Sequence, residues 1–372
     1  MEVVEETLRG NVIRLLQTKK RLPSLTLPKI RRNPLVEIVP LSTGCLGSCT
    51  YCKTKHARGV LGSYPPDEIL KRVEQSIREG VTEIWLSSED TGAYGRDINE
   101  TLPKLLNSIT GVLDKHADKY PNVMLRVGMT NPPFILDHLD EIAKILSHPR
   151  VFSWLHVPVQ SGSDKVLKRM NREYTSSEFM RVADFLKARI PEVIIATDII
   201  CGFPGESEED FQDTMRMVQK YQFGIMNISQ FYPRPGMFLS QCSLCFETFL
   251  ETQTHTNYTG TPAAKMKRVD TKIVKDRSRR LTRLFESFNP YKNLIGRKSQ
   301  KVWVSTERSK RSNHIVAHDK YYRKVLIPVD DENVKPGMCV YVDYLDIARF
   351  HIVASAPLKL ADVKKRRRKS RQ

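Results

Sequence analysis

The sequence has no apolar run approaching the roughly 20 residues that a membrane-spanning helix needs. Its first residues, MEVVEETLRG, are acidic and include no hydrophobic segment of the kind found in secretory signals. Cysteine is scarce, with seven residues at uneven spacing in 372, which is unlike a disulfide-stabilised secreted protein. These absences argue against a membrane span and against secretion, and we expect a reducing, cytoplasmic compartment.

Acidic side chains are also in deficit, because 42 Asp and Glu stand against 60 Lys and Arg, for a net charge of +18. An excess of this size favours a polyanionic partner, and nucleic acid is the first expectation. The segment KKRRRKSR at residues 364–371 fits either a phosphate-binding tail or a nuclear-localisation signal. Both interpretations of the tail stay open.

Between about residues 35 and 232, short β-branched runs alternate six times with amphipathic helical patterns. The strand-like runs are LVEIVPL, EIWLS, NVMLRVG, VFSWLHVPV, EVIIATDII and GIMNISQFY. Expected helices include residues 66–79, with apolar residues every four positions, and residues 207–222, which open with a capping pattern. This alternation predicts parallel βαβ units, and therefore an α/β fold with a partial (β/α)6 barrel.

Polar segments rich in Gly or Pro follow every one of these predicted strands. In chain order they are GCLGSCTYCKTKHARG, SSEDTGAYG, MTNPP, HVPVQSGSD, CGFPGES and YPRPG. In (β/α) barrels the chemistry is carried by the loops at the carboxyl ends of the strands. We therefore expect these segments to meet on one rim and to form the functional site.

The first of these segments contains Cys45, Cys49 and Cys52 within eight residues, followed by His56. Three thiolates and an imidazole at such spacing are able to close a tetrahedral zinc site. Three thiolates are equally able to hold three irons of a [4Fe–4S] cluster and to leave the fourth iron open for a small molecule. Spacing alone leaves both sites possible.

Beyond the barrel, a basic helical stretch at about residues 263–288 leads to the strand-like runs KVWVS, YYRKVLIPV, MCVYVDYL and HIVASA. Short strands separated by turns predict a small all-β barrel. Its basic and aromatic cluster would grip a phosphate backbone and stack on bases. The residues expected to contact RNA are Lys320, Tyr322, Arg323 and Lys324. The alternative is a β module that only braces the larger barrel.

The cysteine loop, with Tyr51 directly before Cys52, resembles the Cx3CxΦC signature of the radical S-adenosylmethionine (SAM) superfamily. The segments CTYCKTKHARG, LHVPVQSGSDKVLKRMNREY, GFPGESEEDF and FYPRPG further resemble the tRNA methylthiotransferases. The CKTKHARG form is similar to the branch that acts on N6-threonylcarbamoyladenosine at position 37, next to the anticodon. The resemblance covers roughly residues 1–236 and 261–357, and the C-terminal strands are similar to the RNA-binding TRAM domain of that family.

The resemblance implies that Cys45, Cys49 and Cys52 hold a catalytic [4Fe–4S] cluster and that SAM chelates its open iron. An electron supplied to the cluster then cleaves SAM to a 5′-deoxyadenosyl radical. The implied SAM contacts are Tyr51, Ser88, Glu89, Gln160, Ser161 and Gly162. The implied reaction places a methylthio group on C2 of the modified adenosine. It requires tRNA and an electron donor protein as partners.

Two features depart from the family pattern. No cysteine precedes Cys45, whereas family members begin with a domain whose three cysteines hold an auxiliary, sulfur-donating cluster. Residues 237–260 interrupt a join that is continuous in the family, and their Cys242, Cys245 and His255 lack a fourth zinc ligand, so we interpret them as an insert. A truncated chain without methylthiolation activity of its own is therefore expected, and a non-catalytic tRNA-binding isoform that holds a metal or a cluster stays open.

The expected organisation has four parts. They are a connector helix and linker at residues 1–34, a barrel at 35–290, a TRAM-like domain at 291–357 and a basic tail at 358–372. The connector helix is suggested by Val4, Leu8, Leu15 and Leu16, which fall roughly on one helical face.

Overall fold

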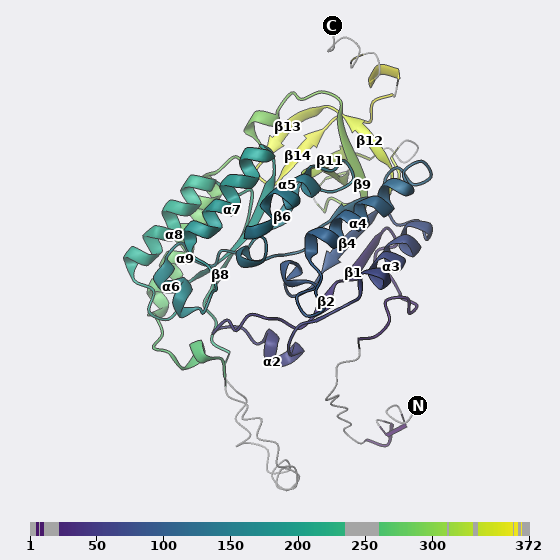
Figure 1. Cartoon of the computed structure of the whole chain (residues 1–372). Helices are drawn as coiled ribbons and strands as arrows, with labels where there is room; N and C mark the ends of the chain where they lie inside the picture. Colours follow the sequence, from purple (N-terminus) through teal and green to yellow (C-terminus); the bar gives the residue numbers. More distant parts are fainter. Residues whose placement is uncertain are drawn as a thin grey trace.

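Six parallel strands build the first part of the chain, as the alternating pattern predicted (Figure 1). They are β1 (Val36–Pro40), β4 (Glu83–Ser87), β5 (Met124–Arg126), β6 (Trp154–His156), β7 (Ile194–Cys201) and β8 (Ile225–Gln230). They pair in the orders β1-β4-β5 and β6-β7-β8, and every pair is parallel. A parallel bridge between Leu125 and Val151 joins the two sheets, so the six strands form one curved wall. The expected partial (β/α)6 barrel is confirmed.

The structure is a computed structural model that describes residues 5–6, 8–10, 22–234, 260–310, 312–329, 334–359, 361–363 and 366. Several sequence expectations concern residues outside these ranges. They are Val4, Leu15 and Leu16 of the connector helix, Cys242, Cys245 and His255 of the insert, and most of the basic tail.

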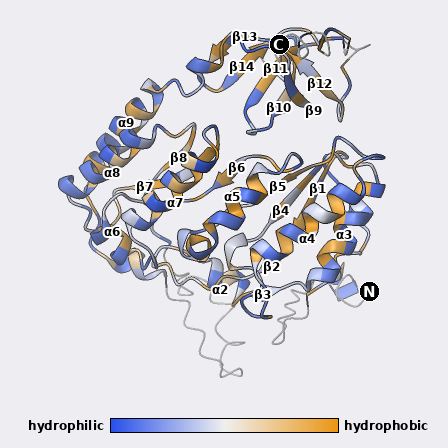
Figure 2. Cartoon of the chain, turned by 45° about the horizontal axis from the view of Figure 1, so that its top comes forward, coloured by the Kyte–Doolittle hydropathy of each residue, from blue (hydrophilic) through white to orange (hydrophobic). Residues whose placement is uncertain are grey.

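Helices cover the outer face of the strand wall. The longer ones are α3 (Pro66–Arg78), α4 (Leu102–Lys115), α5 (Leu139–Ser147), α7 (Ser176–Arg189), α8 (Glu208–Tyr221) and α9 (Thr271–Ser287). Local sequence explains where α7 and α8 begin, because Thr175 with Glu178 and Ser207 with Asp210 form capping boxes. Along α3, the four-residue apolar repeat of Ile69, Val73 and Ile77 is fully buried. Figure 2 shows hydrophobic helix faces of this kind turned towards the strands.

Short elements occupy the connections of the barrel. They are β2 (Ser42–Thr43), α2 (Thr54–Arg58), β3 (Gly62–Ser63), η1 (Thr91–Ala93), η2 (Pro132–Phe134), η3 (Leu136–His138), α6 (Asp164–Arg169), η7 (Pro262–Lys265) and η8 (Lys292–Leu294).

The C-terminal part is a six-stranded sheet, which we call the β unit. Its strands are β9 (Gln300–Arg308), β10 (His314–Asp319), β11 (Lys324–Pro328), β12 (Cys339–Val342), β13 (Tyr344–Ala348) and β14 (His351–Ala354). They lie in the order β12-β9-β10-β11-β14-β13, antiparallel except for the pair of β11 and β14.

The β unit covers the amino-terminal ends of the barrel strands. Met124, Trp154 and Ile194, the first residues of β5, β6 and β7, share one apolar cluster with Val302 and Trp303 of β9. Figure 1 accordingly shows the β unit at the end of the barrel opposite α2. Burial of residues from both parts in a single core fixes the β unit to the barrel.

Within the described ranges, no helix combines the length and the apolar character needed to cross a membrane.

Candidate functional site

The cysteine loop occupies residues 44–59, between β2 and β3, and its two ends are tied together. The backbone N–H of Cys45 donates to the carbonyl of Gly59 at 3.1 Å. Gly44 has φ +75°, and a Cβ at this position would lie 2.1 Å from the Val60 carbonyl oxygen, so only glycine fits. At the middle of the loop, the N–H of Thr50 donates to the Met170 carbonyl at 2.9 Å. The loop is thus held against the segment that follows α6.

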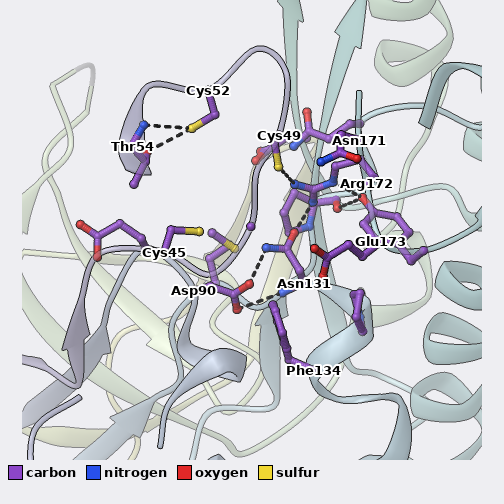
Figure 3. A pocket seen from close by; sticks show the side chains of 18 of the residues that line it. Cys45, Cys49, Cys52, Thr54, Asp90, Asn131, Phe134, Asn171, Arg172 and Glu173 are labelled. Carbon is purple, nitrogen blue, oxygen red and sulfur yellow. Dashed lines mark hydrogen bonds between the residues drawn. The ribbon is translucent and has the colours of Figure 1, made fainter. Parts of the chain in front are cut away.

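Cys45, Cys49 and Cys52 line one cavity (Figure 3). Its walls come from the segments after β1, β4, β5 and β6, together with β7 itself. Further lining residues include Tyr51, Glu89, Asp90, Asn131, Gln160, Arg172, Tyr174 and Asp198. The cavity therefore lies on the carboxyl rim of the strands, where the sequence placed the site.

The three thiols have different neighbours. Cys49 Sγ accepts a hydrogen bond from Arg172 at 3.2 Å, whereas the Cys52 thiol donates to Thr54 Oγ1 at 3.1 Å. Burial raises the pKa of Cys45, so this thiol resists ionisation unless a cation stabilises the thiolate.

The arrangement of these thiols bears on the zinc alternative. His56 lies on the exposed surface of α2 and does not line the cavity. Within the described part of the chain, no three His, Cys, Asp or Glu side chains lie close enough to enclose a single metal ion. Three thiols around one cavity, with His56 outside it, fit a cluster with an open iron better than a closed Cys3His zinc site.

Arg172 is a partly buried cation beside the cysteines. Its guanidinium donates to Cys49 Sγ, to Tyr174 Oη at 3.1 Å and to the side-chain oxygen of Asn131. Burial disfavours its charge, but Tyr174, Tyr51 and Cys49 outweigh burial and raise the pKa of Arg172 above its usual value. A permanent positive charge therefore faces the site and would offset the negative charge of a thiolate at Cys49.

Asp90 orients Asn131 towards Arg172. The Asn131 amide donates to Asp90 Oδ2 at 2.5 Å, and the N–H of Gly92 donates to Asp90 Oδ1 at 3.0 Å. Burial raises the pKa of Asp90 to about 6, even though the hydrogen bonds from Asn131 and Gly92 lower it. Above that pH the ionised carboxylate holds the Asn131 amide, which leaves the Asn131 oxygen free to accept from Arg172.

A second polar pair lies deeper in the barrel. His156 Nε2 is 3.0 Å from Asp198 Oδ1, and Asn227 donates to the same oxygen at 2.8 Å. Burial raises the pKa of Asp198, but His156 and Asn227 outweigh burial and the net pKa is below its ordinary value. Since Asp198 lines the cavity, an ionised carboxylate forms part of its wall.

Comparisons with known proteins place this site in a family. Residues 39–218 match the model of the Radical SAM superfamily. A threonylcarbamoyladenosine tRNA methylthiotransferase from Xenopus laevis is 52% identical over 365 residues, covering 96% of this chain and 59% of that protein. The protein of the same name from Caenorhabditis elegans is 42% identical over 355 residues, covering 95% of this chain and 76% of its own length. This chain belongs to the threonylcarbamoyladenosine tRNA methylthiotransferase family.

The chain spans about three-fifths of the length of most of these relatives, for example 59% of the Drosophila melanogaster protein. Among solved structures, coproporphyrinogen III oxidase from Escherichia coli is similar, with a TM-score of 0.42 and 16% identity over 68% of this chain and 54% of that chain.

Three of the residues that the family resemblance assigned to SAM line the cavity with the cysteines, namely Tyr51, Glu89 and Gln160. The adjacent Ser88 has a buried hydroxyl without a hydrogen-bond partner among the described residues. A buried polar atom without a partner is costly unless a ligand or water satisfies it. These residues therefore fit a polar ligand bound next to the cysteines.

Ser161 and Gly162, also assigned to SAM, do not line this cavity. The N–H of Gly162 donates to Thr214 Oγ1 of α8 at 2.9 Å, and the buried Ser161 hydroxyl lies 3.4 Å from the same oxygen. A Cβ at position 162 would lie 2.7 Å from the backbone of Asp213 and Thr214. These small residues allow α8 to pack closely against the loop, and their contact with SAM stays a prediction.

Lys320 was expected on an RNA-binding surface, but its side chain is inserted into the barrel end of the molecule. Its ammonium donates to the carbonyls of Leu146 at 3.0 Å, His148 at 2.9 Å and Val151. Burial lowers the pKa of Lys320 to about 8. The three carbonyls occupy its three donors and leave none for a phosphate.

Tyr322 and Arg323 are also occupied within the protein. The Tyr322 ring stacks on His318 with centroids 4.2 Å apart and meets Phe152 edge-on at 4.8 Å. Arg323 is buried and pairs with Asp319 at 3.2 Å and Glu192 at 2.8 Å. Of the four predicted RNA contacts only Lys324 is exposed. The other three brace the β unit against the barrel, which was the alternative interpretation of this segment.

Arg172, Asp90 and Asn131 were not expected from the sequence. Each lies in a segment that the family resemblance or the rim pattern had singled out, namely MNREY, SSEDTG and MTNPP. The sequence therefore indicated the segments that contain these residues, but not the residues themselves. The hydrogen bonds that link these residues to Cys49 depend on tertiary placement, which spacing along the chain does not report.

Proposed function

We propose that the chain carries the radical SAM part of a tRNA methylthiotransferase, which places a methylthio group on C2 of N6-threonylcarbamoyladenosine next to the anticodon. One observation carries the proposal: Cys45, Cys49 and Cys52 line a single cavity with Glu89 and Gln160 on the carboxyl rim of a six-stranded parallel barrel. Family membership supplies the reaction and the substrate class.

In this proposal Cys45, Cys49 and Cys52 would hold a [4Fe–4S] cluster, and SAM would bind next to it in the cavity. Glu89 and Gln160, which line the cavity, supply polar contacts to SAM, whereas Ser88 lies beside Glu89 and does not line the cavity. Once bound, the two groups together supply a carbon radical able to abstract hydrogen. Arg172 would offset the negative charge of a thiolate at Cys49.

The partners follow from the same proposal. A tRNA is the substrate, and an electron donor protein reduces the cluster. The cytoplasmic setting expected from the cysteine usage belongs to the proposal as well.

Anaerobic reconstitution with iron and sulfide, followed by SAM and a chemical reductant, tests the radical part. The chain is expected to release 5′-deoxyadenosine, and Cys49→Ala is expected to abolish this release because two thiolates no longer hold the cluster. Cys339→Ala is the matched control, because Cys339 lies in β12, in the β unit, and does not line the cavity. Equal release from the Cys49 and Cys339 variants would refute the assignment.

A second measurement tests the substrate. Release of 5′-deoxyadenosine is compared with tRNA that carries N6-threonylcarbamoyladenosine and with the same tRNA lacking the modification. We expect more release with the modified tRNA. Equal binding of both tRNAs without any 5′-deoxyadenosine would instead favour the non-catalytic isoform.

A further inference from the structure

Helix α9 has two faces of opposite character. Val274, Leu281 and Phe285 are buried against the barrel. The opposite face carries exposed Lys272, Lys275, Arg279 and Arg283. Their spacing of three and then four residues places these four cations on one side of the helix, in a row.

Within the described part of the chain, the four cations of this row form no ion pairs, although Asp276 and Glu286 lie on the same side of the helix. The neighbouring inward arginines are neutralised, since Arg277 pairs with Glu206 at 2.8 Å and Arg280 with Glu208 at 2.7 Å. By contrast, no carboxylate in the described part of the chain forms an ion pair with a member of the row. Asp276 lies beside the row but pairs with Arg280 at 3.3 Å. Like charges in a row repel one another unless a polyanion neutralises them.

The segment that leads into α9 is attached to the cysteine loop. The N–H of Ala263 in η7 donates to the Thr50 carbonyl at 2.9 Å, so the chain leading into α9 is attached to the loop between Cys49 and Cys52. Between this attachment and the helix lie the exposed cations Lys265, Lys267 and Arg268. Exposed cations therefore extend from the cavity rim to α9, with one exposed carboxylate, Asp270, at the N-cap of the helix.

The other end of α9 reaches the β unit and an exposed aromatic ring. Arg349 donates to the carbonyls of Phe285 and Phe288, which attaches the β13–β14 turn to the end of the helix. The adjacent Phe350 is 57% exposed, and its ring centroid lies 6.3 Å from that of Phe285. An exposed aromatic beside cations is the arrangement on which unpaired bases stack.

We propose that the outer face of α9, together with residues 265–268 and Phe350, is a docking track for the RNA strand that enters the cysteine cavity. The helix has 17 residues, so the track is roughly 25 Å long, enough for several phosphates. Figure 1 shows α9 running between the rim and the β unit. This inference rests on the proposed function, because it names the surface that receives the tRNA. An RNA strand is linear and carries bases that stack, so it matches a linear row of cations that ends at an exposed aromatic ring. Binding to a membrane surface requires neither the linear row nor the aromatic ring.

The test replaces all four cations of the row by glutamine in the full chain: Lys272→Gln, Lys275→Gln, Arg279→Gln and Arg283→Gln. A control removes the same charge from the opposite side of the barrel, on or beside α3 and α4: Lys71→Gln, Lys104→Gln, Lys115→Gln and Lys119→Gln. Affinity for tRNA is measured by filter binding across a salt series. The row variant is expected to bind at least tenfold more weakly, with a salt slope flatter by roughly 3–4, because each of the four lost phosphate contacts removes about 0.7–0.9.

Further variants separate charge from fold. Lys272→Arg and Lys275→Arg combined with Arg279→Lys and Arg283→Lys keep every charge and are expected to bind like the parent. Phe350→Ala is expected to weaken binding roughly fivefold or more with an unchanged salt slope, because stacking releases no counterions.

Equal losses in the row variant and the α3–α4 control would show that only net charge matters and would overturn the inference. So would unchanged tRNA binding by the row variant combined with lost binding to vesicles of anionic lipid. SAM cleavage without RNA is measured in parallel. If it persists while the row variant binds tRNA normally, the docking track is wrong and the proposed function stands. If the parent cleaves no SAM but the row variant still loses tRNA, the proposed function fails and the RNA surface stands.

Discussion

The substitution Lys320→Met tests whether Lys320 holds the β unit against the barrel or binds RNA. The substitution keeps the length of the side chain but removes three charge-assisted hydrogen bonds to the carbonyls of Leu146, His148 and Val151. Each such bond contributes about 1.5–3 kcal/mol net, and the several kcal/mol needed to bury the ammonium offset part of the sum. We expect the free energy of unfolding to fall by about 2–4 kcal/mol.

Thermal and urea unfolding measure this loss. At about 2 °C per kcal/mol for a chain of this size, the melting temperature is expected to fall by about 4–8 °C. Lys324→Met is the matched control, because Lys324 is exposed four residues further along and should leave stability within about 0.5 kcal/mol. The reasoning is refuted if Lys320→Met unfolds like the parent but flattens the salt dependence of tRNA binding, since Lys320 would then contact phosphate.

Three further outcomes follow from burial and charge. Glu37→Gln should destabilise the chain by about 3–5 kcal/mol, because Arg72 loses its buried partner, and chemical unfolding measures the loss. Burial raises the pKa of Glu37, but hydrogen bonds from Arg72, Arg31 and Lys29 outweigh burial and lower this pKa to about 2. The stabilisation by the Glu37 carboxylate is therefore present above about pH 4.5 and is lost towards pH 2. The Glu37→Gln variant should not show this loss. Gly162→Ala should cost about 1–3 kcal/mol, because the added Cβ meets the α8 backbone, and an unchanged melting temperature would contradict the close packing. Burial, followed by the charges of Arg126 and Lys324, lowers the pKa of His318 to about 4. Stability should therefore fall as the pH drops from about 6.5 to 4, and a His318→Phe variant that keeps the same pH profile would show that another group is responsible.

The sequence predicted the barrel well because its signals are local. Alternating β-branched runs and helical repeats, as along Ile69, Val73 and Ile77, determine each element and its buried face without reference to distant residues. Placement of the cysteines on the carboxyl rim then followed from the general rule for parallel strands.

The segment at residues 320–324 shows what local pattern cannot predict. A run of cations and aromatics reads as an RNA-binding surface whether it faces solvent or a protein interior. Whether this run faces solvent or the protein interior depends on carbonyls near residue 148 and on Glu192, which are far away in the chain. Ser161 and Gly162 illustrate the same limit, since their small size allows the close packing of α8, which the local pattern does not reveal.

The central claim is that Cys45, Cys49 and Cys52 hold a [4Fe–4S] cluster, and metal and sulfide analysis after anaerobic reconstitution tests it most directly. The account predicts about four irons and about four sulfides per chain, reduced to background in Cys49→Ala and unchanged in Cys339→Ala. One zinc per chain without acid-labile sulfide would contradict it.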